Sequence, residues 1–133
     1  SVVAVERIAK EDTVKYGIIE PKAVSDHIYQ ILNLIEKPEP AQAPSNLGVV
    51  GRYILMPEIF DILEVTPLGK NREIQLTDAL QLLLKQQPMY AYEFEGVRYD
   101  TGTPLGWLKA TIAFALKQSD IGQELREYLR QLL

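Results

Sequence analysis

Short runs of β-branched residues alternate along this chain with segments of helical periodicity. Residues 2–5 are typical of a buried strand, a second strand begins at Tyr16 and is expected to end at Pro21, and residues 47–55 form a longer β-rich run. Helices with one apolar face are expected at residues 59–63, with Pro57 suited to the first turn, and at residues 77–87 and 121–132. Pro104 is expected to open a further helix through Lys117. Because strands and helices are mixed throughout, the sequence predicts an α/β fold.

Residues 24–37 are compatible with two predictions. Their apolar residues fall at helical spacing, and Ser25 or Asp26 could cap such a helix. The apolar positions are Ile28, Ile31, Leu32 and Ile35. Periodicity alone favours a helix, and an extended strand is the alternative.

The connecting segments are marked by charge, proline and glycine. Residues 9–15 are expected to form a charged loop, and residues 38–44, with three prolines, a stiff irregular loop. Residues 89–94 alternate apolar and polar side chains, and Glu95-Gly96 is typical of a turn before residues 97–99. We therefore predict a β-hairpin in this last region.

Composition narrows the classes of function. The chain has 133 residues, which suits one domain or part of one, and its 47% hydrophobic and 24% charged residues are ordinary for a globular protein. A net charge of -4 without a basic cluster argues against nucleic acid, because that binding depends on clustered Lys and Arg. No apolar run approaches a membrane span, and the absence of cysteine suits a reducing compartment. We therefore expect a cytoplasmic protein that binds neither nucleic acid nor membrane.

Four short strings bring together residue types suited to a phosphorylated ligand. The strings are Tyr16-Gly17, Ile35-Glu36-Lys37-Pro38, Gly51-Arg52-Tyr53 and Tyr99-Asp100-Thr101-Gly102-Thr103. They supply an ammonium, two carboxylates and glycines at which a ligand could approach the main chain closely. Neighbouring side chains in a strand point to opposite faces, so Glu36 and Lys37 could serve one ligand only where the strand twists or ends. Pro38 favours such an end.

With residues 46–53 and 73–79, these strings closely resemble the bacterial UTP-glucose-1-phosphate uridylyltransferases, also called UDP-glucose pyrophosphorylases. The resemblance covers essentially the whole chain but only the C-terminal half of that family, and the family's GxGTRxxP phosphate loop has no counterpart here. It implies that residues 1–133 are a fragment, the C-terminal, sugar-phosphate-binding half of a nucleotidyltransferase domain. The implied fold is part of a Rossmann-like sheet with flanking helices. The resemblance also implies that residues 29–36 form a strand, and we adopt that prediction.

The resemblance implies a reaction for the full-length parent. A uridylyl group passes from UTP to glucose 1-phosphate, giving UDP-glucose and pyrophosphate. Glu36 is implied to contact the glucose hydroxyls and Lys37 the phosphate, while Gly17 and Gly51 line the glucose site with Arg52 beside them. The isolated fragment is expected to be inactive, and the full-length enzyme is expected to form a homo-oligomer.

Asp100 is the expected metal ligand. The resemblance implies that it is one of two aspartates that coordinate Mg²⁺, and that Asp100 and Lys37 are the catalytic residues. Oxygen ligands suit Mg²⁺, which keeps waters and phosphate oxygens in its shell. The alternative is that Asp100 caps the helix beginning near Pro104, although Thr103 is better placed to do so.

Other assignments also have alternatives. Glu36 and Lys37 could form a solvent-exposed pair at a strand end, and Arg52 and the tyrosine after it could serve packing or ion pairs. Thr77 or Asp78 is expected to cap the following helix rather than to contact substrate. The alternative functions are a glucose-1-phosphate thymidylyltransferase-type enzyme, and a non-catalytic sugar-nucleotide-binding or oligomerisation module. The module would dock the apolar stripe of the last helix, which comprises Leu125, Tyr128, Leu129, Leu132 and Leu133.

Overall fold

The computed structural model describes residues 1–69 and 72–132. The chain divides into two compact units, Ser1–Phe94 and Glu95–Leu133. Leu133, the last residue of the predicted apolar stripe, lies outside the described residues. None of the helices in the described residues is long and apolar enough to cross a membrane.

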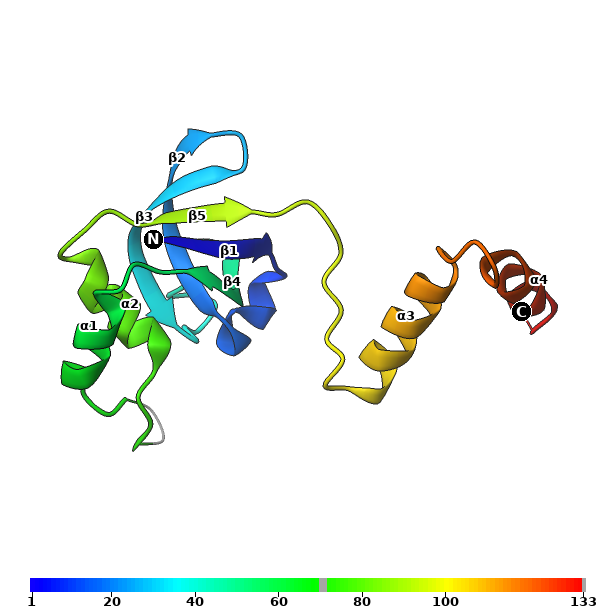
Figure 1. Ribbon diagram of the computed structural model, residues 1–133. Coiled ribbons are helices and arrows are strands. Elements are labelled where there is room, and N and C mark those ends of the chain that lie inside the picture. The colour runs from blue at the N-terminus through cyan, green and yellow to red at the C-terminus, as the bar shows by residue number, and fades with distance from the viewer. Residues whose placement is uncertain (70–71, 133) are drawn as a thin grey trace. The chain divides into compact units, whose positions relative to one another are not determined.

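Within the described residues of the first unit, five strands form a closed sheet (Figure 1). They are β1 (Val2–Arg7), β2 (Gly17–Ser25), β3 (Ile28–Glu36), β4 (Leu47–Ile54) and β5 (Tyr90–Glu93). Their order around the sheet is β1-β4-β2-β3-β5, and β5 closes it by pairing with β1. The β1–β5 pair is parallel and the other pairs are antiparallel. Together with its helices, this mixed sheet confirms the predicted α/β class.

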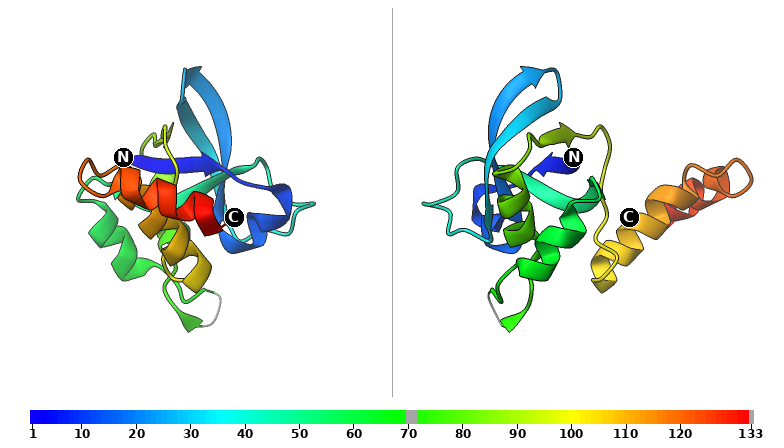
Figure 2. Two further views of the ribbon diagram at one scale, coloured as in Figure 1. Left: turned by 90° about the vertical axis from the view of Figure 1, so that its right-hand side faces the viewer. Right: turned by 60° about the vertical axis from the view of Figure 1, so that its left-hand side comes forward.

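Aliphatic side chains fill the interior of the first unit. Val3 and Val5 of β1 are fully buried, so β1 alternates between an inward and an outward face. Helices α1 (Ile59–Val65) and α2 (Leu76–Leu84) contact each other, α2 packs against β3, and both helices contribute to the same core (Figure 2). Leu80 and Leu83 of α2 are buried there. This packing brings the first turn of α2 close to the end of β3.

β3 is the strand for which periodicity alone favoured a helix. Ile31 and Asn33 pair with consecutive residues of β2, so Leu32 between them is an extra residue, a β-bulge. The bulge lets Ile31 and Leu34, three positions apart, both be buried, whereas Leu32 is half exposed. The strand prediction is confirmed, and the helix-like spacing results from the bulge.

The predicted hairpin at residues 89–99 is wrong. β5 pairs with β1 along one edge and with β3 along the other, so neither edge is free for a further strand. Residues 97–99 form no strand. Those residues instead belong to the second unit.

Two predicted boundaries also change. Residues 9–15, expected as a loop, contain the 3₁₀ helix η1 (Lys10–Lys15). β2 does not end at Pro21 but continues to Ser25. The bulge of β3 lies opposite Pro21, and a bulge is one of the few places where a sheet accepts a residue that cannot donate a hydrogen bond.

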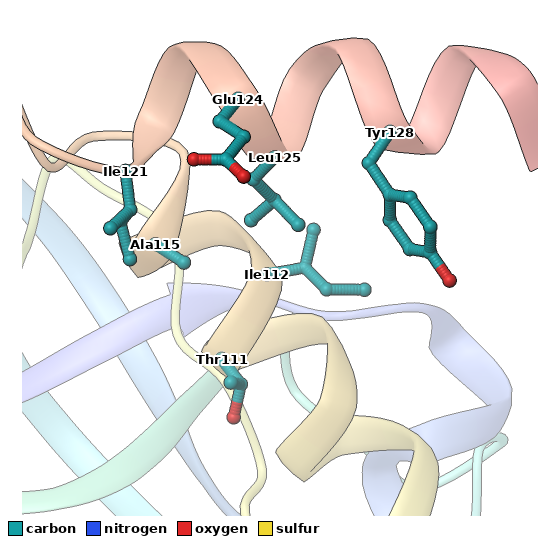
Figure 3. A pocket seen from close by; sticks show the side chains of 7 residues that line it. All are labelled: Thr111, Ile112, Ala115, Ile121, Glu124, Leu125 and Tyr128. Atoms are coloured by element: carbon teal, nitrogen blue, oxygen red, sulfur yellow. The ribbon is translucent and has the colours of Figure 1, made fainter.

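The second unit contains helices α3 (Pro104–Ala115) and α4 (Gly122–Leu132). Thr103 caps α3 as predicted, because its Oγ1 accepts a hydrogen bond from the amide of Gly106 at 3.1 Å. A cavity of about 530 Å³ lies between the helices, where Ile112 and Leu125 point toward each other (Figure 3). Tyr128 remains 56% exposed, so the predicted apolar stripe packs only in part against α3.

Candidate functional site

The Glu36-Lys37 pair lies where β3 ends. Lys37 has a φ of 46°, in the left-handed region, and Pro38 follows it. This conformation is unfavourable for a residue with a side chain, and a following proline disfavours α conformations further. The turn interrupts the alternation of the strand and brings Nζ of Lys37 to 3.4 Å from Oε1 of Glu36. The strand therefore ends at this position, and an ammonium and a carboxylate converge there.

Hydrogen bonds hold the main chain around Lys37. Its amide donates to the carbonyl oxygen of Tyr16 at 2.9 Å. The hydroxyl of Thr13, a fully buried residue of η1, lies 3.1 Å from the carbonyl oxygen of Pro38 and 3.0 Å from that of Lys10. The segment predicted as a charged loop therefore fixes the chain where it leaves the site. Its charged composition carried no signal of this role.

The Glu36 carboxylate is held by Thr77 in the first turn of α2. The Thr77 hydroxyl donates to Oε2 of Glu36 at 2.6 Å, and the Glu36 side chain is only 18% exposed. Gly17 is buried and pairs directly opposite Glu36 across the β2–β3 ladder. A Cβ at Gly17 would lie 3.2 Å from the Thr77 hydroxyl and 3.3 Å from the Glu36 carboxylate. The missing side chain therefore makes room for this hydrogen bond.

The prediction that Thr77 or Asp78 caps α2 is wrong. Gln75 occupies the cap position, and its side chain makes no capping hydrogen bond. The carboxylate of Asp78 instead packs against Gly69, where an added Cβ would lie 2.6 Å from Oδ2. Helix-capping preferences could not reveal the contact of Thr77, because it joins residues 41 positions apart.

Tyr53 also lies near the carboxylate of Glu36. Burial raises the pKa of the half-buried Tyr53 phenol, and the negative charge of Glu36 raises this pKa further. The sequence left packing or an ion pair open for Tyr53, and the residue packs against the core of the first unit. Its closeness to Glu36 could not be read from the short string that contains it.

Gly51 and Arg52 have different surroundings. Gly51 has a φ of 77°, and no atom lies within 4 Å of a Cβ added there, so its backbone is open to an approaching ligand. The exposed Arg52 donates to the carbonyl oxygen of Gly51 at 3.4 Å, and no described hydrogen bond or ion pair joins it to Glu36 or Lys37. Arg52 instead lines a cavity of about 280 Å³ on the sheet, together with Val2, Ala4, Tyr53, Ile54 and Tyr92.

A cavity of about 290 Å³ with both polar and apolar walls lies beside Glu36. It is lined by Leu34, Ile35, Glu36, Gln75, Asp78 and Gln81. The amide of Gln81 lies 3.1 Å from the side-chain oxygen of Asn33 and 3.1 Å from the carbonyl oxygen of Leu34, which fixes its orientation. Carboxylate and amide groups in a concave site are the groups that orient a small polar ligand.

Asp100 belongs to the second unit, in the loop before α3. Its Oδ1 accepts a hydrogen bond from the amide of Gly102 at 3.0 Å, and its carbonyl oxygen accepts one from the hydroxyl of Thr103 at 3.3 Å. A Cβ at Gly106 would overlap the carbonyl group of Asp100, so the first turn of α3 packs closely under this loop. The carboxylate is exposed and held by a tight turn, and Thr103 rather than Asp100 caps the helix.

One exposed carboxylate suits Mg²⁺, which proteins bind through one or two carboxylates with waters and phosphate oxygens completing the shell. Among the described residues, no group of three or more His, Cys, Asp or Glu side chains is placed to hold a metal ion. Asp100 alone could therefore contribute to such a site only with ligands from elsewhere.

Comparison with known proteins identifies the relatives of the chain. It is 46% identical over 132 residues to the UTP-glucose-1-phosphate uridylyltransferase of Staphylococcus epidermidis, covering 99% of this chain and 46% of that protein. A crystal structure of a UDP-glucose pyrophosphorylase complexed with UDP-glucose matches 88% of this chain and 44% of its own, with 46% identity and a TM-score of 0.82. The structure of UTP-bound UGPase from Acinetobacter baumannii matches 99% of this chain and 45% of its own, with 34% identity and a TM-score of 0.86.

The resemblance seen in the sequence is thereby confirmed. The chain spans about half the length of the curated relatives it matches. The family model described as nucleotidyl transferase matches residues 2–116, which is most of the chain. The chain therefore belongs to the nucleotidyl transferase family.

Proposed function

We propose that this chain is the sugar-phosphate-binding part of a UTP-glucose-1-phosphate uridylyltransferase. The observation that carries the proposal is the convergence of Glu36 and Lys37 at the strained end of β3. The relatives support it, since one solved structure holds UDP-glucose and another holds UTP. In the complete enzyme, this chain forms the C-terminal part of a Rossmann-like sheet, and the remaining half binds the nucleotide.

The reaction needs alignment more than covalent chemistry. An oxygen of glucose 1-phosphate attacks the α-phosphorus of UTP, and pyrophosphate leaves. Lys37 places its ammonium on the sugar phosphate, and Glu36 accepts hydrogen bonds from glucose hydroxyls. The open main chain at Gly51 lets the sugar ring approach. For Arg52, a substrate contact stays a prediction.

Asp100 is the ligand that this chain would offer to Mg²⁺. When bound, the ion neutralises phosphate charge that would otherwise oppose the attack. The turn through Gly102 keeps the Asp100 carboxylate exposed and limits its rotation. The other ligands would come from the substrates, from water and from the rest of the enzyme.

Steady-state kinetics of the complete enzyme test this function. Lys37→Ala is expected to weaken the use of glucose 1-phosphate, and Asp100→Asn to abolish Mg²⁺-dependent turnover. Asp120→Asn is the matched control, because Asp120 also accepts a main-chain amide, that of Ile121 at 3.0 Å, in an exposed loop. Near-normal kinetics in both Lys37→Ala and Asp100→Asn would end the proposal.

The choice of nucleotide needs its own measurement. A thymidylyltransferase would share the Glu36-Lys37 pair and Asp100, so these residues do not distinguish the two classes. For a uridylyltransferase we expect kcat/KM to be higher with UTP than with dTTP in the complete enzyme. The reverse preference would assign the chain to the thymidylyl class. The isolated 133 residues are expected to give no turnover, and detectable UDP-glucose synthesis by them would contradict this division of roles.

A further inference from the structure

Three side chains meet at the end of β3, and only two of them have a part in the proposed reaction. Thr77 donates to Oε2 of Glu36 at 2.6 Å, while Lys37 lies 3.4 Å from Oε1. The first distance is that of a charge-assisted hydrogen bond, and the second is longer than the roughly 2.7–2.9 Å of a tight ammonium–carboxylate contact. The carboxylate therefore bonds more closely to the hydroxyl than to the ammonium next to it.

We infer that Thr77 is a positioning residue, which holds Glu36 toward the sugar and keeps it from closing fully onto Lys37. This inference rests on the proposed function. If the Thr77 hydroxyl were absent, the Glu36 carboxylate could rotate and shorten its contact with the ammonium. Lys37 would then be partly neutralised and less available to the sugar phosphate, and Glu36 would no longer face the glucose hydroxyls.

The surroundings of Thr77 fit a defined orientation. The hydroxyl comes from the first turn of α2, a helix fixed in the core by Leu80 and Leu83. Gly17 lies beside both groups, since an added Cβ would be 3.2 Å from the Thr77 hydroxyl and 3.3 Å from Oε2 of Glu36, and its missing side chain leaves space for them to meet. The donor and the acceptor are thus both held by packed elements, which is what a positioning contact requires.

Thr77→Val removes the hydroxyl at nearly constant volume, and Thr77→Ser keeps it. In the complete enzyme we expect Thr77→Val to lower kcat/KM for glucose 1-phosphate by about tenfold or more, the usual loss for a hydrogen bond to a charged group. Most of the loss should lie in KM for glucose 1-phosphate, with KM for UTP unchanged. Thr77→Ser should restore most of the activity.

A double-mutant cycle separates positioning from structural support. Thr77→Val should cost little in a Glu36→Ala background, because the carboxylate that accepts the Thr77 hydrogen bond is gone and no acceptor replaces it. The matched control is Thr66→Val, since the buried Thr66 hydroxyl donates to the carbonyl oxygen of Ile62 at 2.7 Å in the same unit. That variant is expected to change thermal stability without changing KM.

Each outcome is decisive. An unchanged kcat/KM in Thr77→Val, an equal loss in Thr77→Ser, or the same cost in both Glu36 backgrounds would overturn the inference. If Thr77→Val does not fold, Thr77→Ala makes the same comparison, because it removes the hydroxyl without adding bulk. A wild-type enzyme that makes no UDP-glucose would instead reject the proposed function, whatever the variants do.

Discussion

Gly17 lies directly opposite Glu36 across the β2–β3 pair, and the Glu36 carboxylate occupies part of the space that a side chain at position 17 would need. The hydroxyl of Thr77 occupies another part of that space. β2 therefore contributes to the site a bare stretch of main chain rather than a functional group. The resemblance implied that Gly17 lines the glucose site; the structure shows Thr77 and Glu36 atoms packed where its side chain would be, and a contact with the sugar stays a prediction.

Gly17→Ala should lower the free energy of unfolding of the 133-residue chain by about 1–3 kcal/mol, the usual cost of adding a methyl group to a filled site. Urea denaturation measures this change. The penalty should shrink in a Thr77→Ala background, because the nearest atom to the added Cβ is the Thr77 hydroxyl. An equal penalty in both backgrounds would mean that the crowding lies elsewhere.

Two substitutions of Lys37 test the strain of its backbone separately from the role of its ammonium. Since Lys37 has a φ of 46°, Lys37→Gly should be more stable than Lys37→Ala by about 1–2 kcal/mol, the cost of a side chain in left-handed backbone. Both variants lack the ammonium, so both should use glucose 1-phosphate more weakly in the complete enzyme. Thermal denaturation compares the stabilities, and Lys15→Gly against Lys15→Ala is the control at a position outside the left-handed region. Equal stabilities at position 37 would contradict the strain argument.

The sequence could predict most elements of the fold but not their pairing. Periodicity located α2 and α4 within a few residues, because one face of each helix must be apolar, and Pro104 indicated where α3 begins. Periodicity did not identify β3 as a strand, because the bulge at Leu32 puts Ile31 and Leu34 on one face at a spacing that also fits a helix. The false hairpin after β5 has a similar cause, since a strand does not reveal which distant partners occupy its edges.

The candidate site likewise contains residues that the sequence could predict and residues that it could not. Glu36, Lys37 and Asp100 stand out in the sequence because their residue types and neighbours form characteristic strings. Thr77 and Thr13 support that site through contacts with residues far away in the chain, and single hydroxyl groups carry no pattern. A sequence therefore reveals candidate functional groups more readily than the groups that hold them in place.

The loop that carries Asp100 depends on Gly106. A side chain there would overlap the carbonyl group of Asp100, so Gly106→Ala must displace the loop or the first turn of α3. We expect Gly106→Ala to raise the Mg²⁺ concentration needed for half-maximal turnover of the complete enzyme. Thr103→Ala removes the cap of α3 and the 3.3 Å hydrogen bond to the Asp100 carbonyl oxygen but adds no atom under the loop, so it should cost about 1 kcal/mol in stability with a smaller effect on the Mg²⁺ requirement. A larger effect from Thr103→Ala would show that capping, rather than packing under Asp100, controls the loop.

The pH dependence of stability should report on Glu93, which joins β5 to β1 and β3. Burial alone would raise the pKa of Glu93, but hydrogen bonds from Tyr29 and Arg7, the charge of Arg7 and that of His27 lower it below its usual 4.5. The contacts include Nε of Arg7 at 2.9 Å and the Tyr29 hydroxyl at 2.7 Å. Because the pKa of Glu93 is lowered in the folded state, this stabilisation is present above pH 4.5 and is lost as the pH falls through the folded pKa.

Tyr29 makes the stabilisation by the same network depend on pH in the alkaline range as well. Its hydrogen bond to Glu93, followed by burial and the negative charge of Glu93, raises the pKa of Tyr29 above 10.0 despite the opposing effect of Arg7. A raised pKa stabilises the fold below pH 10.0, and this contribution is lost as the pH rises through the folded pKa.

Glu93→Gln tests the acid limit of this network. It should destabilise the chain at neutral pH and lose its effect in acid, as measured by urea denaturation at a series of pH values. Glu20→Gln, an exposed change on β2, is the control, and a Glu93→Gln penalty that stayed constant from neutral pH into acid would refute the role given to its charge.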